Sequence, residues 1–571
     1  MAEADDTLIP RQRRAVGTIV PIARWLPSYR WRRDLSADVL GGVAVAALLI
    51  PEAMGYAGVA DVPPQVGLYA ALGGVLAYAV FGATSILVVG PASAVAALSA
   101  SIVGDLSGGA DPVVVTSALA ITSGLLLVLA GALRFGWIVN FISRPVLHAF
   151  VAGLSISIII GQLGGLLGVE VEGESAVSKL VDTVSQISDW HSLTAVVGIG
   201  TLAALLLLER YAKRVPAAVV VVVIGVLLVV LFHVNERGVA VVGDIPQGLP
   251  DVGVPQLSVS QWLELLAGGT ALVLVGFSEG YASASTVAGR TGAVVDADQE
   301  LVGSGAANIA SGLLGGLAVS GSLSKSSASM AAGSRTQLAN LTSGLLVLAT
   351  LLFLAPVFEK LPEPVLAGVV IVAVLRSANP RRVVDLWQVN RLDFAAGLTT
   401  FVLVLVWDTL PAMLVGVALS LVFVVRRASF PDVVRLSRDS HGTFRRTAGS
   451  GASLEQGRVA VVRFEAPLIY ANCDRLHVAV RTLLLENDAL ARVVIDAEMI
   501  SDLDYSGAET LEAIDDDLAG RNIELVLARA HGRARGQIGR SGLARRFEGR
   551  LASSVDEAAT LPDVPDTPAP A

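Results

Sequence analysis

Cysteine, aromatic residues and charge are all scarce in this sequence of 571 residues. Its one cysteine, Cys473, excludes an intramolecular disulfide, and a lone thiol argues against a metal site. Aromatic residues make up 5% of the chain and charged residues 16%, and no basic stripe with interleaved aromatics occurs, which argues against nucleic-acid binding. The sequence also has no P-loop, no paired cysteine and histidine nucleophile and no metal-ligand spacing. We therefore expect no enzyme, no catalytic residue, no metal and no cofactor.

What the chain has in excess is apolar surface. Hydrophobic residues make up 53% of it and the mean hydropathy is +0.67, which is more than one soluble core could bury. Runs such as "AAVVVVVIGVLLVVLF" approach the roughly 20 residues that a helix needs to cross a bilayer. The apolar character stops after about Arg427, and no signal peptide is recognised. We predict a cytoplasmic segment at 1–36, a membrane domain at 37–428, a linker at 429–456, a soluble domain at 457–557 and a disordered, Pro-rich tail at 558–571.

Hydropathy places fourteen membrane spans in the membrane domain. They begin near residues 38, 66, 90, 113, 145, 191, 216, 265, 301, 322, 336, 364, 392 and 411. With the amino terminus inside, the loops assigned to the cytoplasm carry Arg134, Arg144, Arg210, Lys213, Arg214, Arg290, Arg335, Arg376, Arg381, Arg382 and Arg391, whereas those outside carry only Lys179, Arg237 and Lys360. Because Lys and Arg prefer cytoplasmic loops, this supports an even number of spans. We expect a multi-pass protein of the inner (cytoplasmic) membrane with both termini in the cytoplasm.

The third and tenth spans are short and polar. The third begins "VVGPASAVAALSA" and the tenth "SGSLSKSSAS", and both stand third in their half if the chain divides seven plus seven near residue 240. The first span of each half also carries a carboxylate, Glu52 or Glu279, and both pairs are separated by about 230 residues. This pattern indicates a duplication. Paired, interrupted spans in corresponding positions predict a transporter site near the bilayer midplane.

A helix that starts inside the membrane is suited to bind an anion. Its first backbone N–H groups lack partners, and its dipole places partial positive charge at that end. Ser322 and Ser324 could add hydroxyl donors and Lys325 a full positive charge. Lys325 in hydrocarbon needs a partner, so the alternative is a permanent salt bridge with Glu279 or Glu52. Small residues also let helices pack closely, and packing is the role we expect for Ser326, Ser327 and Ser329.

A carboxylate near an anion site suggests coupling to a cation. Protonation of Glu279, or a bound Na⁺, would remove its repulsion of the anion. Ser283 stands one turn after Glu279 and could add an oxygen ligand for Na⁺. No second acidic ligand lies nearby in the sequence, so we favour H⁺ as the coupling ion. Glu52 follows a proline near the end of its apolar run and could alternatively reach the membrane interface.

Four motifs, in order and register, resemble the SulP sulfate permease family, the bacterial relatives of the solute-carrier 26 anion transporters. They are "LLIPEAMGYAGVADVPPQVGLYAAL", "VVGPASAVAAL", "DADQELVGSGAANIASGL" and "SGSLSKSSAS…GSRTQLANL". The resemblance implies an all-helical fold of fourteen spans in a seven-plus-seven inverted repeat, with a core domain that moves against a gate domain, and a homodimer. Carried over to matching positions, it implies an anion site formed by Glu52, Tyr56, Ala92, Ser93, Ser322, Ser324 and Lys325.

The same resemblance assigns further residues. Glu279 matches the acidic position of span eight in ion-coupled members, and Glu300 and Asn308 are expected to hold the loop and the start of span nine. Lys325 departs from the family pattern, because many members have arginine there. Lysine keeps the charge but lacks the planar, bidentate guanidinium, so the geometry of oxyanion binding does not carry over.

The soluble domain alternates between strand and helix patterns. "GRVAVVRFEAPLIYAN" predicts two strands around a turn, and a helix, a strand, an amphipathic helix and a further strand follow, which indicates a small α/β layer structure. It is similar to the STAS domain that follows the membrane part in this family, and such a domain could bind a cytoplasmic regulatory partner. "DLDYSG" matches the turn where anti-sigma antagonists carry a phosphorylated serine, here Ser506. The alternative is helix capping by Asp504 or Ser506.

The function we expect is secondary active transport of a small anion, with sulfate favoured, by H⁺-coupled symport and alternating access. Bicarbonate or dicarboxylate transport, with Na⁺ as coupling ion, remains an alternative, as does an anion channel or exchanger. A nucleobase symporter is a weaker alternative, because Lys325 and the STAS domain favour an anion.

Overall fold

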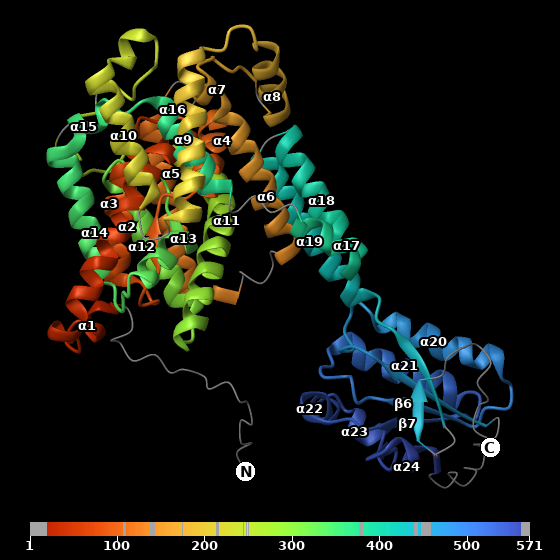
Figure 1. The fold of residues 1–571 in the computed structure, drawn as a ribbon. Helices are drawn as coiled ribbons and strands as arrows, with labels where there is room; N and C mark the ends of the chain where they lie inside the picture. The colour runs from red at the N-terminus through yellow and green to blue at the C-terminus, as the bar shows by residue number, and fades with distance from the viewer. Residues whose placement is uncertain are drawn as a thin grey trace. The chain divides into compact units, whose positions relative to one another are not determined.

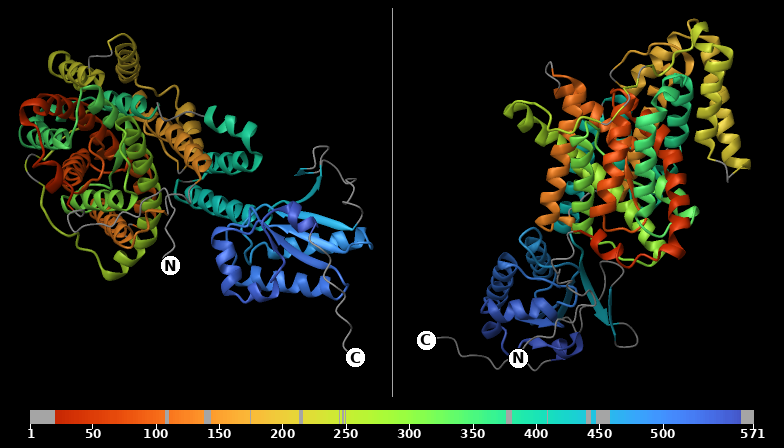
Figure 2. Two further views of the ribbon diagram at one scale, coloured as in Figure 1. Left: turned by 90° about the horizontal axis from the view of Figure 1, so that it is seen from below. Right: turned by 90° about the vertical axis from the view of Figure 1, so that its left-hand side faces the viewer.

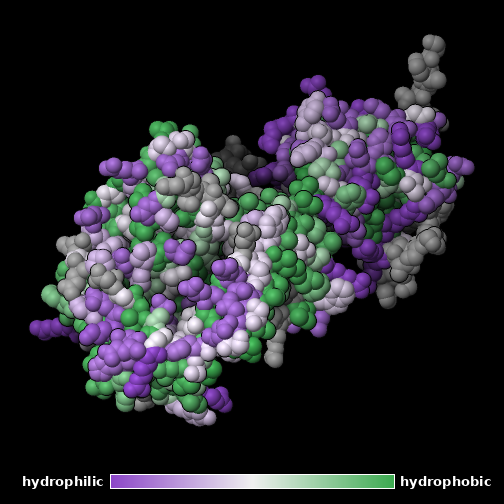
Figure 3. Space-filling view, turned by 90° about the horizontal axis from the view of Figure 1, so that it is seen from above, coloured by the Kyte–Doolittle hydropathy of each residue, from purple (hydrophilic) through white to green (hydrophobic). Residues whose placement is uncertain are grey.

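The computed structural model describes residues 20–560 apart from 107–109, 138–142, 174, 213–215, 244, 247, 249, 376–380, 408, 439–442 and 447–457. The chain divides at Ser420 into two compact units, which are described separately (Figure 1). The predicted amino-terminal residues 1–19 and most of the predicted tail, 561–571, lie outside the described residues. Apolar side chains are prominent on the surface of the membrane unit, whereas hydrophilic ones dominate that of the second unit (Figure 3).

The first unit is a bundle of helices that mostly run alongside one another (Figure 2). Its first half contains α1 Ile22–Trp25, α2 Trp31–Val59, α3 Pro64–Phe81, α4 Ser93–Leu106, α5 Pro112–Ala132, α6 Arg144–Gly161, α7 Leu163–Leu167, α8 Ala176–Ser185, α9 Ser192–Tyr211 and α10 Ala217–Phe232. The second half contains α11 Val259–Thr291, α12 Ala297–Leu313, α13 Leu323–Ala331, α14 Leu338–Ala349, α15 Ala355–Glu359, α16 Glu363–Leu375, α17 Arg381–Val389, α18 Arg391–Val406 and α19 Thr409–Ser429.

A helix lies at each of the fourteen predicted positions. In the described part of the chain, eight helices are long and apolar enough to cross a membrane, and Ser93–Gly104, Ala217–Phe232 and Glu363–Leu375 are shorter apolar helices. The number of crossings therefore stays a prediction. α2 begins at Trp31, before the predicted start near residue 38, and the boundary of the cytoplasmic segment 1–36 stays a prediction. The polar first turns of α2 continue the helix beyond the apolar run, and hydropathy does not detect them.

Glycines let the core helices approach closely. A Cβ atom at Gly124 of α5 would lie 2.7 Å from the carbonyl oxygen of Gly305 on α12, and one at Gly312 would lie 2.5 Å from the carbonyl oxygen of Ser117. Small residues at membrane helix interfaces allow this backbone contact. The close pair of α5 and α12 gives the interrupted spans a rigid support.

Two short strands precede the two interrupted helices. β1, Val88–Gly90, pairs antiparallel with β2, Ser320–Ser322, so that Val89 lies opposite Gly321. α4 follows β1 and α13 follows β2 directly. The sequence patterns at spans three and ten thus correspond to a strand followed by a short helix in both halves.

Buried amide side chains hold the chain just before each strand. Asn308 of α12 donates to the carbonyl of Val319 and accepts from its N–H, both at 2.9 Å. Before β1, the carbonyl of Leu87 accepts from Gln337 at 3.1 Å and from Asn340 at 2.8 Å. Asn308 therefore has a structural role, but it holds the segment before β2 rather than the start of span nine.

Glu300 ties α12 to α3. Its carboxylate accepts from the hydroxyl of Tyr78 at 2.6 Å and from that of Thr84 at 3.2 Å, and the Glu300 side chain is fully buried. These bonds fix the chain between α3 and β1, in agreement with the structural role expected for Glu300.

The second unit contains a six-stranded sheet in the order β4-β3-β5-β6-β7-β8. Strands β5 to β8 are parallel, and β3 is antiparallel to both of its neighbours. The strands are β3 Val433–Arg438, β4 Phe444–Arg446, β5 Val459–Phe464, β6 Arg492–Asp496, β7 Glu524–Ala528 and β8 Leu551–Ala552. The helices are α20 Cys473–Glu486, α21 Tyr505–Ala519, α22 Gly532–Arg540, α23 Leu543–Arg546 and α24 Val555–Thr560.

Three expectations for this unit are corrected. The predicted linker 429–456 contains β3 and β4, because "VVRLSR" alternates apolar and polar residues and pairs with β5. The second strand expected in "GRVAVVRFEAPLIYAN" is absent from the described part of this stretch, residues 458–472, where only an isolated bridge joins Leu468 to Leu503. The predicted tail begins too early, since residues 558–560 belong to α24.

Candidate functional site

Lys325 connects the starts of the two interrupted helices. It lies in the first turn of α13, and its ammonium Nζ donates to the carbonyl of Pro91, just before α4, at 3.3 Å. Ser326 adds a second connection, because its hydroxyl accepts from the N–H of Val88 in β1 at 2.9 Å. The predicted anion-binding segments of the two halves are therefore in direct contact.

Lys325 forms an ion pair with Glu52 of α2. Its Nζ lies 2.6 Å from the carboxylate Oε2, and the lysine side chain is 1% exposed. This oxygen has no well-aligned hydrogen-bond donor, so the contact is a charge pair without favourable hydrogen-bond geometry. The Tyr56 ring centroid lies 5.3 Å from the ammonium, within cation–π range. Of the two partners left open by the sequence, the structure pairs Lys325 with Glu52 rather than Glu279.

The serines of the "SGSLSKSSAS" segment divide into two groups. Ser322 caps α13, because its hydroxyl accepts from the N–H of Lys325. The same hydroxyl lies 3.1 Å from the hydroxyl of Ser324, and the Ser324 residue is exposed. Ser326 donates to the carbonyl of Ser322, and Ser329 donates to Ser334 at 2.8 Å. Both of these are buried, which agrees with the packing role expected for them.

The start of α4 offers backbone donors. Its first intrahelical bond runs from the N–H of Ala96 to the carbonyl of Ala92. The N–H groups of the first turn, from Ser93 onward, therefore lack a helix carbonyl as partner. Ala92 is buried and Ser93 partly buried, so this end of the helix lies inside the unit. Such amides favour a negative charge.

Glu279 lies on α11, which packs against β2. The hydroxyl of Ser320 donates to the carbonyl of Gly276 at 2.7 Å, three residues before Glu279. One carboxylate oxygen of Glu279 is buried without a hydrogen-bond partner among the described residues. Ser283 is buried one turn further along α11. In the described part of the chain, no three His, Cys, Asp or Glu side chains lie together as metal ligands would.

A cavity of about 840 Å³ reaches Glu52 and Ser324 from one end of the bundle. Its walls come from α2, α9, α10, α13 and α16, and along α2 it runs from Glu52 to Leu40, a distance of about 18 Å at the helical rise. Glu209, near the end of α9, lines its outer part. The sequence analysis missed Glu209. An acidic residue in the basic segment "ERYAKR" was the signal that could have identified it.

A polar cluster at the amino end of α2 was also missed. Asp38 is fully buried and accepts from the N–H of Arg335 at 2.7 Å, from the hydroxyl of Thr336 at 2.7 Å and from Tyr29 at 3.1 Å. Arg335 also pairs with Asp34. Burial and the Asp38 carboxylate raise the pKa of Tyr29 well above its ordinary value. The spacing of Asp34 and Asp38, on one face of a helix, was the available signal.

In the second unit, Asp504 caps α21. Its carboxylate accepts from the N–H of Gly507 at 2.8 Å and from that of Tyr470 at 2.7 Å. Ser506 lies in the first turn, is partly exposed and does not cap the helix. The capping alternative thus applies to Asp504 and leaves the hydroxyl of Ser506 uncommitted to that role.

Residues 35–400 match the sulfate permease family, and residues 452–558 match the STAS domain. The chain belongs to the sulfate permease family and carries a C-terminal STAS domain. It is 32% identical over 511 residues to a probable sulfate transporter of Mycobacterium tuberculosis, covering 87% of this chain and 90% of the relative. To sulfate transporter 4.1, chloroplastic, of Arabidopsis thaliana it is 29% identical over 552 residues, covering 92% and 80%.

Two solved structures share the fold. The murine solute carrier 26 family member A9 anion transporter, in its inward-facing state, superposes with a TM-score of 0.87 at 21% identity and covers 97% of this chain and 96% of its own. The transmembrane domain of the cyanobacterium bicarbonate transporter BicA gives 0.60 at 21% identity and covers 68% and 97%. These likenesses place the first unit in the solute-carrier 26 fold.

Proposed function

We propose that this protein is a secondary active sulfate transporter that couples sulfate import to H⁺ by alternating access. The observation that carries the proposal is the buried Lys325–Glu52 pair at the junction of α4 and α13, at the inner end of a large cavity. The names of its sulfate-transporter relatives support sulfate over bicarbonate, the substrate named for BicA.

The charge balance of the pair supports coupling. Lys325 is neutralised by Glu52, so the empty site has no net charge from these two residues. A dianion that enters the site competes with the Glu52 carboxylate for the ammonium and brings unbalanced negative charge into an apolar region. Protonation of a carboxylate offsets part of that charge. In this proposal the Glu52 carboxylate occupies the position beside Lys325 until the substrate anion displaces it.

Glu279 is the residue that we propose carries the coupling proton. It stands on α11 beside β2, and one of its oxygens is buried without a partner among the described residues. Protonation removes the charge of a buried carboxylate that lacks a partner, whereas a distant counter-ion leaves that charge in place. Na⁺ bound between Glu279 and Ser283 is the alternative.

The decisive experiment is uptake into liposomes by the purified protein. Labelled sulfate, bicarbonate, fumarate and uracil are compared, each with and without an inward proton gradient. We expect sulfate uptake that the gradient drives and that excess unlabelled sulfate inhibits. Gradient-driven uptake of another anion would name a different substrate, and dependence on Na⁺ alone would replace the proton. Uptake of uracil alone would refute the anion site.

We further propose that the protein is a homodimer in the inner membrane with both termini in the cytoplasm. The distribution of Lys and Arg among its loops supports this orientation. The STAS domain is then cytoplasmic, where a regulatory partner and a kinase acting on Ser506 have access. A phosphopeptide map of the protein from cells grown with scarce and abundant sulfate tests the modification, and an unmodified Ser506 in all conditions would contradict it.

A further inference from the structure

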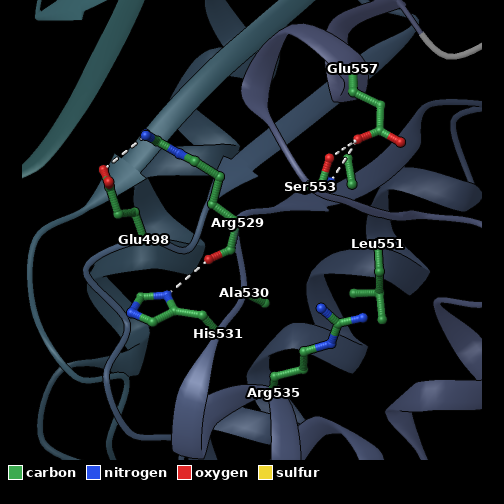
Figure 4. A pocket seen from close by; sticks show the side chains of 9 residues that line it. Glu498, Arg529, Ala530, His531, Arg535, Leu551, Ser553 and Glu557 are labelled. Carbon is green, nitrogen blue, oxygen red and sulfur yellow. Dashed lines mark hydrogen bonds and ion pairs between the residues drawn. The ribbon is translucent and has the colours of Figure 1, made fainter.

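A pocket of about 510 Å³ lies at the carboxyl ends of three neighbouring parallel strands in the second unit (Figure 4). Its walls come from the segments that follow β6, β7 and β8, and they are formed by Glu498, Arg529, Ala530, His531, Arg535, Leu551, Ala552, Ser553 and Glu557. The crevice at the carboxyl ends of parallel strands is where α/β folds bind ligands, and this volume is within the range of small-molecule sites.

One wall of the pocket consists of charged side chains that are already paired with one another. Arg529 donates through Nε to the fully buried Asp496 at 2.9 Å, forms a second contact with the same carboxylate and lies 3.0 Å from Glu498. Its φ of 59° is left-handed, a conformation that is unfavourable for a residue with a side chain. These contacts hold Arg529 in place and leave it no charge to offer a ligand.

Arg535 and Glu557 face the same space from two different helices (Figure 4). Arg535 stands on α22, and its side chain has no ion pair or hydrogen bond in the described part of the chain, whereas most arginines of this unit pair with an acid. Glu557 of α24 uses one carboxylate oxygen, which accepts from the N–H and hydroxyl of Ser553 at 2.7 and 2.6 Å. These bonds lower the pKa of Glu557, so it is ionised at neutral pH.

Aliphatic surface also lines the pocket beside these two charges. Ala530, Leu551 and Ala552 contribute aliphatic surface, and His531 uses its Nδ1 in a 3.0 Å contact with the carbonyl of Arg529. A simple anion that binds Arg535 meets the Glu557 carboxylate in the same pocket. A simple cation that binds Glu557 meets Arg535. Each singly charged class of ligand thus carries one unfavourable interaction.

We propose that this pocket binds a small zwitterion, an ω-amino acid or a short peptide, whose carboxylate contacts Arg535 and whose ammonium contacts Glu557. The carbon chain between the two charges lies against Leu551 and its neighbouring alanines. The site is separate from the one that holds the transported anion, and the proposal does not depend on which anion that is.

Binding to the full-length protein in detergent micelles tests the proposal by isothermal titration calorimetry. The probes are glycine, 4-aminobutanoate, 5-aminopentanoate and 6-aminohexanoate, which separate the two charges by increasing lengths. We expect saturable binding with an optimum length. At that length the N-acetyl and methyl-ester derivatives, which each lack one charge, bind at least about tenfold more weakly, since a lost charge-assisted contact is worth 1.5–3 kcal/mol.

Two variants locate the charges. In Arg535→Gln the methyl ester and the zwitterion bind alike, and in Glu557→Gln the N-acetyl derivative and the zwitterion bind alike. Arg540→Gln, on the same helix outside the pocket, leaves all affinities unchanged. Melting curves that match the wild type show that each variant is folded. The proposal is wrong if no zwitterion binds, or if sulfate or a nucleoside triphosphate binds through Arg535 more tightly than any of them.

Discussion

Each unit of this protein buries a carboxylate against basic side chains, but the number of partners differs. In the membrane unit, Glu52 meets one lysine through one oxygen. In the STAS domain, Asp496 at the end of β6 meets Arg463 of β5 and Arg529 after β7, and both of its oxygens are used. A single ion pair can open when a proton or an anion competes for it, whereas a multiply bonded carboxylate fixes its neighbours. We infer that the number of basic partners distinguishes the pair proposed to act in transport, Glu52 with Lys325, from the structural cluster around Asp496.

The largest effect is expected from Lys325→Ala. If Lys325 holds the anion as proposed, loss of the ammonium removes the anion's main attraction and leaves Glu52 buried without a counter-charge, so sulfate uptake falls by more than about 30-fold, the lower end for a broken buried charge pair. Lys325→Arg keeps the charge and retains part of the uptake. Ser327→Ala, a neighbouring packing position, stays within about twofold of the wild type. Equal sulfate affinity in Lys325→Ala would show that the pair does not hold the anion.

Replacing both members of the pair sharpens the comparison. Glu52→Leu combined with Lys325→Met is expected to leave the protein folded, with the elution volume of the wild type on size exclusion, because apolar residues of similar volume replace a buried pair at little cost. Sulfate uptake is nevertheless abolished. Retained uptake in this double variant would mean that the pair is structural, like the cluster in the STAS domain.

Breaking the buried charge cluster of the STAS domain is expected to reduce the stability of that domain without changing the chemistry of transport. Asp496→Asn leaves Arg463 and Arg529 facing a neutral group and costs about 3 kcal/mol, the low end for breaking a buried pair, because both arginines are partly exposed. Thermal unfolding of this unit is expected to shift downward by about 6–12 °C. Glu498→Gln, which removes the more exposed acid, costs less than about 1 kcal/mol. Similar shifts for both variants would refute the special status of Asp496.

Glu279→Gln distinguishes the two carboxylates of the membrane unit. If Glu279 carries the coupling proton, the variant exchanges sulfate across the membrane but no longer accumulates it when an inward proton gradient is applied. The control is Glu264→Gln, an exposed position on the same helix, which keeps the gradient response. Accumulation that persists in Glu279→Gln would assign the proton to Glu52.

The smallest effect is expected at the cap of α21. Asp504→Ala removes an N-cap carboxylate and costs about 1 kcal/mol, whereas Ser506→Ala changes stability by less than about 0.5 kcal/mol. Thermal unfolding of the two variants measures both values. A larger loss for Ser506→Ala would mean that its hydroxyl supports the fold and that its modification would act by unfolding the turn.

Much of the fold was predictable because helices and interruptions leave local signals. The offset of about 230 residues between "VVGPAS" and "SGSLSK" identified both interrupted spans, and hydropathy located the helices around them. The partner of Lys325 was not predictable, since Glu52 and Glu279 occupy equivalent places in the two halves and only the packed structure distinguishes them. Likewise β4 and β8 contain only three and two residues, so their pairing with the longer strands β3 and β7 is what defines them.

The pairing of β1 with β2 also means that this part of the fold cannot form until the second half of the chain has been synthesised. Val88 bonds to a strand that begins 232 residues later, at Ser320, so the first half emerges from the ribosome with an edge that has nothing to pair with. At about 5–20 residues per second this delay lasts roughly 10–50 s. Unpaired backbone groups are costly in lipid, so the β1 edge of the nascent first half must be kept out of contact with lipid during this interval. A ribosome stalled between α10 and α11 would therefore hold a chain that is inserted but has no site.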